Sequence, residues 1–159
     1  MSNVLLCLGE YAKTPYYIEE DGRNIYSIEE LCYYLYHQAY LMEDSFVTQK
    51  LGEWIAEQLK LSALGKEIFK LAGKPDALSK LMTLLSENVG YYEKQEWETL
   101  IYEIGRHNKL SAKERKKHRA DGFLNSKKYI PALEEYEAII RETRADDIKL
   151  RAKVYHNMG

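Results

Sequence analysis

Apolar side chains recur at intervals of three and four residues along most of the chain, and this spacing predicts α-helices. The first strong stretch begins at Ser27, where Ser27 and Glu30 form a capping-box pattern ahead of Ile28, Leu31 and Leu35. Further stretches with this spacing lie at about 47–59, 62–72, 78–89, 97–108, 111–126, 131–140 and 148–159. The pattern predicts about eight helices, joined by short turns into stacked antiparallel pairs.

The first 26 residues follow a different pattern. Two β-prone runs, 16–18 and 24–26, flank a turn that contains Asp21 and Gly22. Asp-Gly between such runs is typical of a β-hairpin. Because a lone hairpin is marginally stable in water, it must pack against the helices. We therefore expect an all-α fold with a short β-hairpin at 16–26.

Composition narrows the class of protein. The 159 residues are 45% hydrophobic and 30% charged, which fits one globular domain, and the net charge of −2 disfavours a globally basic nucleic-acid binder. Two cysteines, Cys7 and Cys32, are too few for a disulfide scaffold or a structural zinc site, so we expect no metal and no cofactor. The longest apolar run, near residues 4–8, is too short to span a membrane, and it is not a secretory signal because it lacks a basic n-region and a small-residue cleavage site. We expect a soluble cytoplasmic protein with no membrane partner.

Tyrosine is the compositional outlier, with 14 residues, eight of them among the first 40. Tyrosine combines a large contact area with a polar tip, so such a cluster suits an interface. The tyrosine cluster is also explained by side chains at the boundary between a helical core and water, and we favour this explanation.

Basic side chains concentrate between residues 106 and 128. Nine of them stand there against two acidic ones, Glu114 and Asp121; the nine are Arg106, Lys109, Lys113, Arg115, Lys116, Lys117, Arg119, Lys127 and Lys128. Such a segment can attract an acidic peptide or a phosphate backbone. A solvated helix face with its charges spread around the helix is the simpler interpretation.

Small and aromatic residues follow a recognisable order in the C-terminal third. Ala132 and Tyr136 form an Ala-x3-aromatic pair on a predicted helix, and Ala120 and Phe123 stand at a small and an aromatic position on the helix before it. This segment resembles the tetratricopeptide repeat (TPR), a helix–turn–helix unit of 34 residues. The chain departs from the pattern where the family has Trp, Leu, Pro and a small residue; these departures are Lys116, Arg119, Arg144 and Ile139.

A second copy starts near the end of the chain. Tyr155-x2-Met158-Gly159 resembles the Trp-x2-Leu-Gly start of the repeat. The resemblance covers about one and a half repeats at 111–159, and residues 1–110 carry no repeat signature. We therefore expect a helical N-terminal region at 1–110 and a TPR-like segment at 111–159 of an α-solenoid.

The resemblance implies a non-catalytic protein–protein interaction module or scaffold. In the family, the first helix of each repeat lines a groove that binds peptides, and the corresponding candidate contacts here are Lys113, Lys117, Asp121 and Asn157. Asp121 stands where a carboxylate clamp needs an asparagine, so we expect a general peptide groove rather than such a clamp. The partner is expected to be a protein or peptide.

Two other function classes are weaker. A nucleic-acid-associated regulatory protein could use the basic segment at 106–128, but the tyrosine cluster that would stack bases lies about 70 residues away in the sequence. An enzyme is disfavoured because the four histidines are scattered and match no catalytic motif; they are His37, His107, His118 and His156.

The half-repeat at the end would leave an apolar helix face uncovered, because repeats are stable only when neighbours stack. We expect the chain to be the N-terminal piece of a longer TPR protein. If it ends at Gly159, a second copy in a homodimer would have to cover that face.

Overall fold

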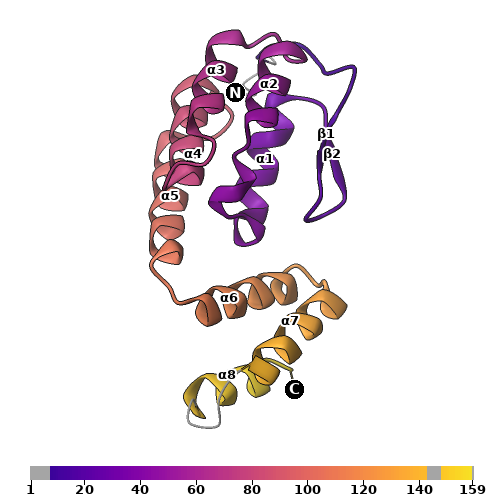
Figure 1. The fold of residues 1–159 in the computed structure, drawn as a ribbon, viewed down its shortest axis with the longest axis vertical. Coiled ribbons are helices and arrows are strands. Elements are labelled where there is room, and N and C mark those ends of the chain that lie inside the picture. Colours follow the sequence, from indigo (N-terminus) through magenta and orange to yellow (C-terminus); the bar gives the residue numbers. More distant parts are fainter. Residues whose placement is uncertain (1–7, 143–147, 159) are drawn as a thin grey trace, which may run out of the picture. The chain divides into compact units, whose positions relative to one another are not determined.

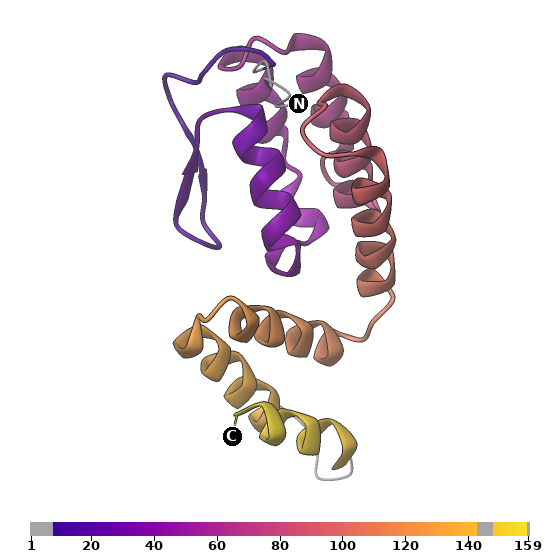
Figure 2. The ribbon, with the colours of Figure 1, turned by 180° about the vertical axis from the view of Figure 1, so that it is seen from behind.

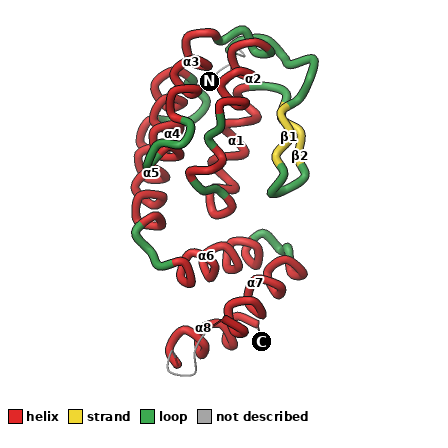
Figure 3. The backbone as a smooth tube through the Cα atoms, in the orientation of Figure 1, coloured by secondary structure: helices red, strands yellow, loops and turns green. Residues whose placement is uncertain are grey.

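The computed structural model describes residues 8–142 and 148–158 (Figure 1). Its contacts divide the chain into two compact units, the N-terminal unit (residues 1–105) and the C-terminal unit (residues 106–159). The described part contains eight α-helices and one two-stranded sheet (Figure 3). The fold is therefore all-α with a short N-terminal β-hairpin, as the sequence predicts.

The hairpin consists of β1 (Tyr16–Ile18) and β2 (Arg23–Ile25), paired antiparallel with Ile18 opposite Arg23. Ile18 and Ile25 are buried, and the hairpin lies beside helix α1 (Ile28–Gln38) in both ribbon views (Figures 1 and 2). These contacts supply the apolar support that an isolated hairpin lacks.

The N-terminus of α1 has the predicted capping interactions with one difference. The Ser27 hydroxyl accepts a hydrogen bond from the backbone N–H of Glu30 at 3.1 Å. The Glu30 carboxylate accepts from the N–H of Tyr26 at 2.8 Å, one residue before the cap. Both bonds satisfy backbone donors at the helix start, so Ser27 and Glu30 serve the purpose that the sequence indicated.

Two short 3-10 helices, η1 (Ala39–Leu41) and η2 (Asp44–Phe46), connect α1 to α2 (Gln49–Glu57). Residues 43–45 interrupt the apolar spacing in the sequence, which predicts that they cap the next helix, and this prediction is wrong. Thr48 caps α2, while the Asp44 carboxylate accepts from the N–H groups of Asp76 and Leu78, both at 3.0 Å. Asp44 thereby holds the start of α4 (Ala77–Asn88).

Helices α2 and α3 (Ser62–Leu71) approach each other very closely through two glycines. A Cβ atom built on Gly65 would lie 2.5 Å from the carbonyl oxygen of Gly52, and one on Gly52 would lie 2.6 Å from the backbone nitrogen of Phe69. No larger residue fits at either glycine without moving a helix backbone.

The core of the N-terminal unit is closed by α4 and α5 (Lys94–Asn108), whose Trp97 is fully buried. Tyr36 and Tyr92 stack at 4.1 Å between ring centroids, and both contact the Trp97 ring edge to face. The hydroxyl of Tyr92 lies 3.2 Å from Nε2 of His37. Several tyrosines thus sit at the margin of a helical core, with ring faces inward and polar tips available for hydrogen bonds.

The C-terminal unit contains α6 (Ala112–Asn125), α7 (Tyr129–Glu142) and α8 (Ile148–Met158). Ser111 and Glu114 have the same spacing as Ser27 and Glu30, which predicts a capping box, and they form one with bonds of 3.3 and 2.9 Å. Ala120, Phe123, Ala132 and Tyr136 are all buried, as their positions in the pattern predict.

The spacing of apolar residues in the sequence predicts that Leu133, Ala152 and Tyr155 pack inward, and these three predictions are wrong. Leu133 is exposed on α7, and among the described side chains of α8 Val154 is buried, while Ala152 and Tyr155 are exposed. Consecutive helical residues differ by about 100° in direction, so a shift of one residue moves the apolar face to a different side. Gly159 and Arg144 lie outside the described residues, as do residues 146 and 147, whose two aspartates predict the start of the last helix.

Candidate partner-binding site

The Asp121 carboxylate is the centre of a polar cluster that joins all three helices of the C-terminal unit. Lys117, one turn earlier on α6, contacts Oδ2 through its Nζ at 2.6 Å. The hydroxyl of Tyr136 on α7 donates to Oδ1, and Nδ2 of Asn157 on α8 donates to the same oxygen at 2.7 Å. We call these four residues the Asp121 cluster.

The cluster favours the ionised form of Asp121. Burial acts to raise the pKa of Asp121, but the hydrogen bonds from Lys117, Tyr136 and Asn157 and the charge of Lys117 outweigh it and hold the pKa below its ordinary value. Burial, together with the bond to Asp121, raises the pKa of Tyr136 above its ordinary value. Tyr136 therefore stays a neutral donor at physiological pH.

Three of the four predicted contact residues thus come together, but they bind one another. The side chains of Lys117 and Asp121 are only 18% and 30% exposed. Lys113 lies outside this cluster, half-buried on α6, one turn before Lys117. The negative charge of Asp121 is therefore balanced by Lys117 within the C-terminal unit. Of the four predicted contacts, Lys113 is the one outside the cluster.

Sequence reasoning missed the hydroxyl of Tyr136 as a member of the site. The four-residue spacing of Lys117 and Asp121 on one helix could have indicated their ion pair. Nothing local points to the bonds from Tyr136 and Asn157, which lie 15 and 36 residues away from Asp121.

Asp121 should make the stability of the C-terminal unit depend on pH below about 5. Its pKa in the folded protein lies below the unfolded value of about 3.9, so its stabilising contribution is complete well above that value and is lost as pH falls toward the folded pKa. We expect Asp121→Asn to melt below wild type at pH 7 and the difference to shrink at pH 3. A difference that stays constant over this range would exclude a linked ionisation of Asp121.

Further ion pairs involve the basic side chains of α6. Lys116 contacts Glu142 at 2.6 Å, and Arg119 contacts Glu135 at 3.3 Å, both across to α7. The hydrogen bond and charge of Lys116 hold the pKa of Glu142 below its ordinary value. With the Lys117–Asp121 pair, three of the nine bases in the segment are matched by carboxylates of the same unit.

Cys32 is a free, buried cysteine of the N-terminal unit. Burial, with the nearby charge of Glu29, raises the pKa of Cys32 to about 12, so this thiol is a weak nucleophile. Cys7 lies outside the described residues. Among residues 8–142 and 148–158, no group of three or more His, Cys, Asp and Glu side chains is placed to hold a metal ion.

The helices of the described residues are all too short or too polar to cross a membrane. No family model matches the chain, and comparisons with curated proteins and with solved structures find no significant match.

Proposed function

We propose that the C-terminal unit is a non-catalytic, TPR-like module that binds a peptide segment of a partner protein. The observation that carries this proposal is the burial of Ala120, Phe123, Ala132 and Tyr136, the positions that the resemblance assigns to the contact between paired helices. Small residues at Ala120 and Ala132 allow α6 and α7 to approach, and the aromatic side chains fill the space beside them.

The binding face in this proposal is formed by α6 and α8. They correspond to the first helices of two successive repeats, and the bond between Asn157 and Asp121 holds them together. Because Lys117, Asp121 and Asn157 use their polar groups on one another, Lys113 is the principal contact for a ligand. A peptide with an acidic side chain or a C-terminal carboxylate suits that lysine.

The alternative, nucleic acid, receives less support. A phosphate backbone binds to cations that can release its counterions, and Lys116, Lys117 and Arg119 are already paired with carboxylates. These pairs would have to open before the three side chains could contact phosphates.

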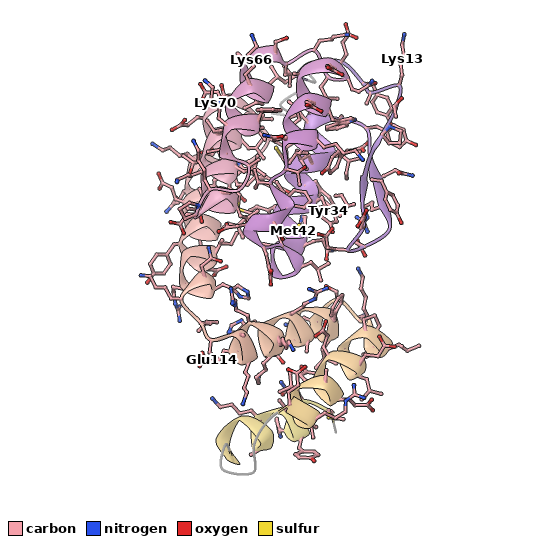
Figure 4. The ribbon with its side chains drawn as sticks, viewed as in Figure 1. Lys13, Tyr34, Met42, Lys66, Lys70 and Glu114 are labelled. Atoms are coloured by element: carbon pink, nitrogen blue, oxygen red, sulfur yellow. The ribbon has the colours of Figure 1, made fainter. Side chains whose placement is uncertain are left out.

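Peptide selection with the full chain tests the proposal. Peptides selected from a displayed random library should be acidic, and Lys113→Glu should weaken their binding about tenfold, the effect of losing one charge-assisted contact. Lys70→Glu is the matched control, because Lys70 is an exposed lysine on α3 (Figure 4) and should leave the affinity unchanged.

Three results would count against this function: no selected peptides, selected peptides that bind both variants equally, or binding that only Lys70→Glu weakens. If a single-stranded RNA homopolymer instead binds with a steep salt dependence, and Lys113→Glu weakens it, the nucleic-acid alternative gains support.

A further inference from the structure

A cavity of about 290 Å³ lies in the N-terminal unit, between β2 and the first half of α1. Its lining is aromatic and charged, with Arg23 from β2, Glu29, Glu30, Tyr33 and Tyr34 from α1, and Tyr91 from the segment after α4. Tyr34 lies on the side of α1 that faces the hairpin (Figure 4). The cavity thus combines two carboxylates with three phenol rings.

The carboxylates of the lining are incompletely satisfied. Oε2 of Glu30 accepts from the N–H of Tyr26, and Oε1 of Glu29 accepts from the N–H of Leu8 at 2.5 Å. Oε2 of Glu29 is shielded from solvent and has no hydrogen-bond partner among the described residues. A shielded carboxylate oxygen without a donor costs free energy. Glu29 is one of the residues that line the cavity, so a donor bound there lies near this carboxylate.

The positive charge of Arg23, the cation in the lining, is already balanced by other residues. The Arg23 guanidinium lies over the Tyr34 ring, 5.6 Å from its centroid, and contacts the Asp21 carboxylate at 3.4 Å. Neither Glu29 nor Glu30 forms an ion pair with a described residue, so the lining keeps an excess of negative charge. Arg23 on Tyr34 also shows that a guanidinium fits against a phenol face here.

The other two rings of the lining are partly exposed, although the Tyr33 ring packs against His37 with 4.3 Å between the ring centroids. Tyr33 is 47% exposed, and Tyr91 is half-buried against Tyr92, with 4.8 Å between the ring centroids. Phenol faces attract cations and repel anions, and nearby carboxylates strengthen this preference. The volume is at the small end for ligand pockets and suits one side-chain-sized group.

We propose that this cavity binds a guanidinium group. A guanidinium is planar, so it can stack on Tyr33 or Tyr91, and its fork of N–H donors matches the Glu29 carboxylate. An ammonium has neither property. The group could come from a free arginine-like molecule or from an arginine side chain of a polypeptide. This site is separate from the proposed peptide site, since it lies in the other unit and uses other residues.

Titration of the ¹⁵N-labelled full chain with small probes tests the site. N-acetyl-L-argininamide should cause saturable amide shifts at Arg23, Asn24 and Tyr33, and N-acetyl-L-lysinamide should bind at least fivefold more weakly. Tighter binding of N-acetyl-L-argininamide than of free L-arginine would indicate arginine within a polypeptide, and the reverse would indicate a free molecule. No saturable shifts, or equal binding of the lysine probe, would overturn the proposal.

Two substitutions separate binding from folding. Glu29→Gln keeps the shape and the acceptor for Leu8 but removes the charge, and it should weaken N-acetyl-L-argininamide about tenfold. Tyr33→Leu removes a half-exposed ring and should weaken it about threefold. Glu53→Gln and Tyr102→Leu, both at exposed positions, are the matched controls. Melting temperatures identify any variant that fails to fold, and wild-type affinity in both cavity variants would refute the site.

Discussion

Replacing Tyr136 with alanine should lower the free energy of unfolding of the C-terminal unit by about 3–5 kcal/mol. The side chain is 1% exposed, so its removal leaves a cavity between the helices. The change also removes a donor from the Asp121 carboxylate, which then relies on Lys117 and Asn157. Tyr136→Phe keeps the ring and should show the smaller cost of the lost hydrogen bond, about 1–2 kcal/mol.

The two tryptophans make this effect measurable unit by unit. Trp54 and Trp97 both lie in the N-terminal unit, so their fluorescence follows that unit, while far-ultraviolet circular dichroism follows helices in both. We expect Tyr136→Ala to move the urea transition seen by circular dichroism more than the fluorescence transition. Tyr155→Ala is the matched control, because Tyr155 is 53% exposed and its loss should change stability by less than about 0.5 kcal/mol. Equal losses from both tyrosines would contradict the packing of α7 and α8.

Replacing Gly65 with alanine should destabilise the N-terminal unit by about 3 kcal/mol. The added methyl group would lie 2.5 Å from the Gly52 carbonyl oxygen and 2.6 Å from the Cβ of Ala56, so α2 and α3 would have to separate. Tryptophan fluorescence during urea unfolding measures the loss, since Trp54 is on α2.

Gly105→Ala provides the matched control for a glycine within a helix. Nothing lies within 4 Å of a Cβ atom built on Gly105 in α5, so the alanine should stabilise the protein by about 0.5–1 kcal/mol through helix propensity alone. Opposite signs for the two glycines would support the close approach of α2 and α3. A neutral or stabilising Gly65→Ala would refute it.

Local patterns in the sequence predicted much of this fold. The Asp-Gly turn indicated the hairpin, the Ser111–Glu114 spacing indicated a capping box, and the three-and-four spacing indicated the helices. Each of these signals depends on residues within a few positions of one another. Such signals survive folding because tertiary contacts rarely oppose all of them at once.

What the sequence missed depends on contacts between distant segments. Asp44 caps a helix that begins more than 30 residues later, and Gly52 and Gly65 acquire their importance only when two helices cross. The spacing of apolar residues predicted Ala152 and Tyr155 on the inward face of α8, whereas both are exposed and Val154 is buried.

In the candidate site, too, local sequence signals were predictive and contacts between distant segments were missed. Lys117, Asp121 and Asn157 were selected as residues that face a ligand, and folding brings them together as partners of one another. The sequence could place Lys117 and Asp121 on one helix face, but the bonds from Tyr136 and Asn157 require the packing of α7 and α8 on α6. The Asp121 carboxylate, which the sequence indicated as unfavourable for a carboxylate ligand, therefore stabilises the C-terminal unit.

The most direct test of the proposed function is the position of a bound peptide on the full chain. We would add a selected acidic peptide to the ¹⁵N-labelled protein and map the amide shifts. The proposal predicts shifts concentrated on α6 and α8, around Lys113, Lys117 and Asn157. Shifts concentrated instead on the exposed apolar residues of α7, Ile130 and Leu133, or on the N-terminal unit, would contradict a TPR-like binding face.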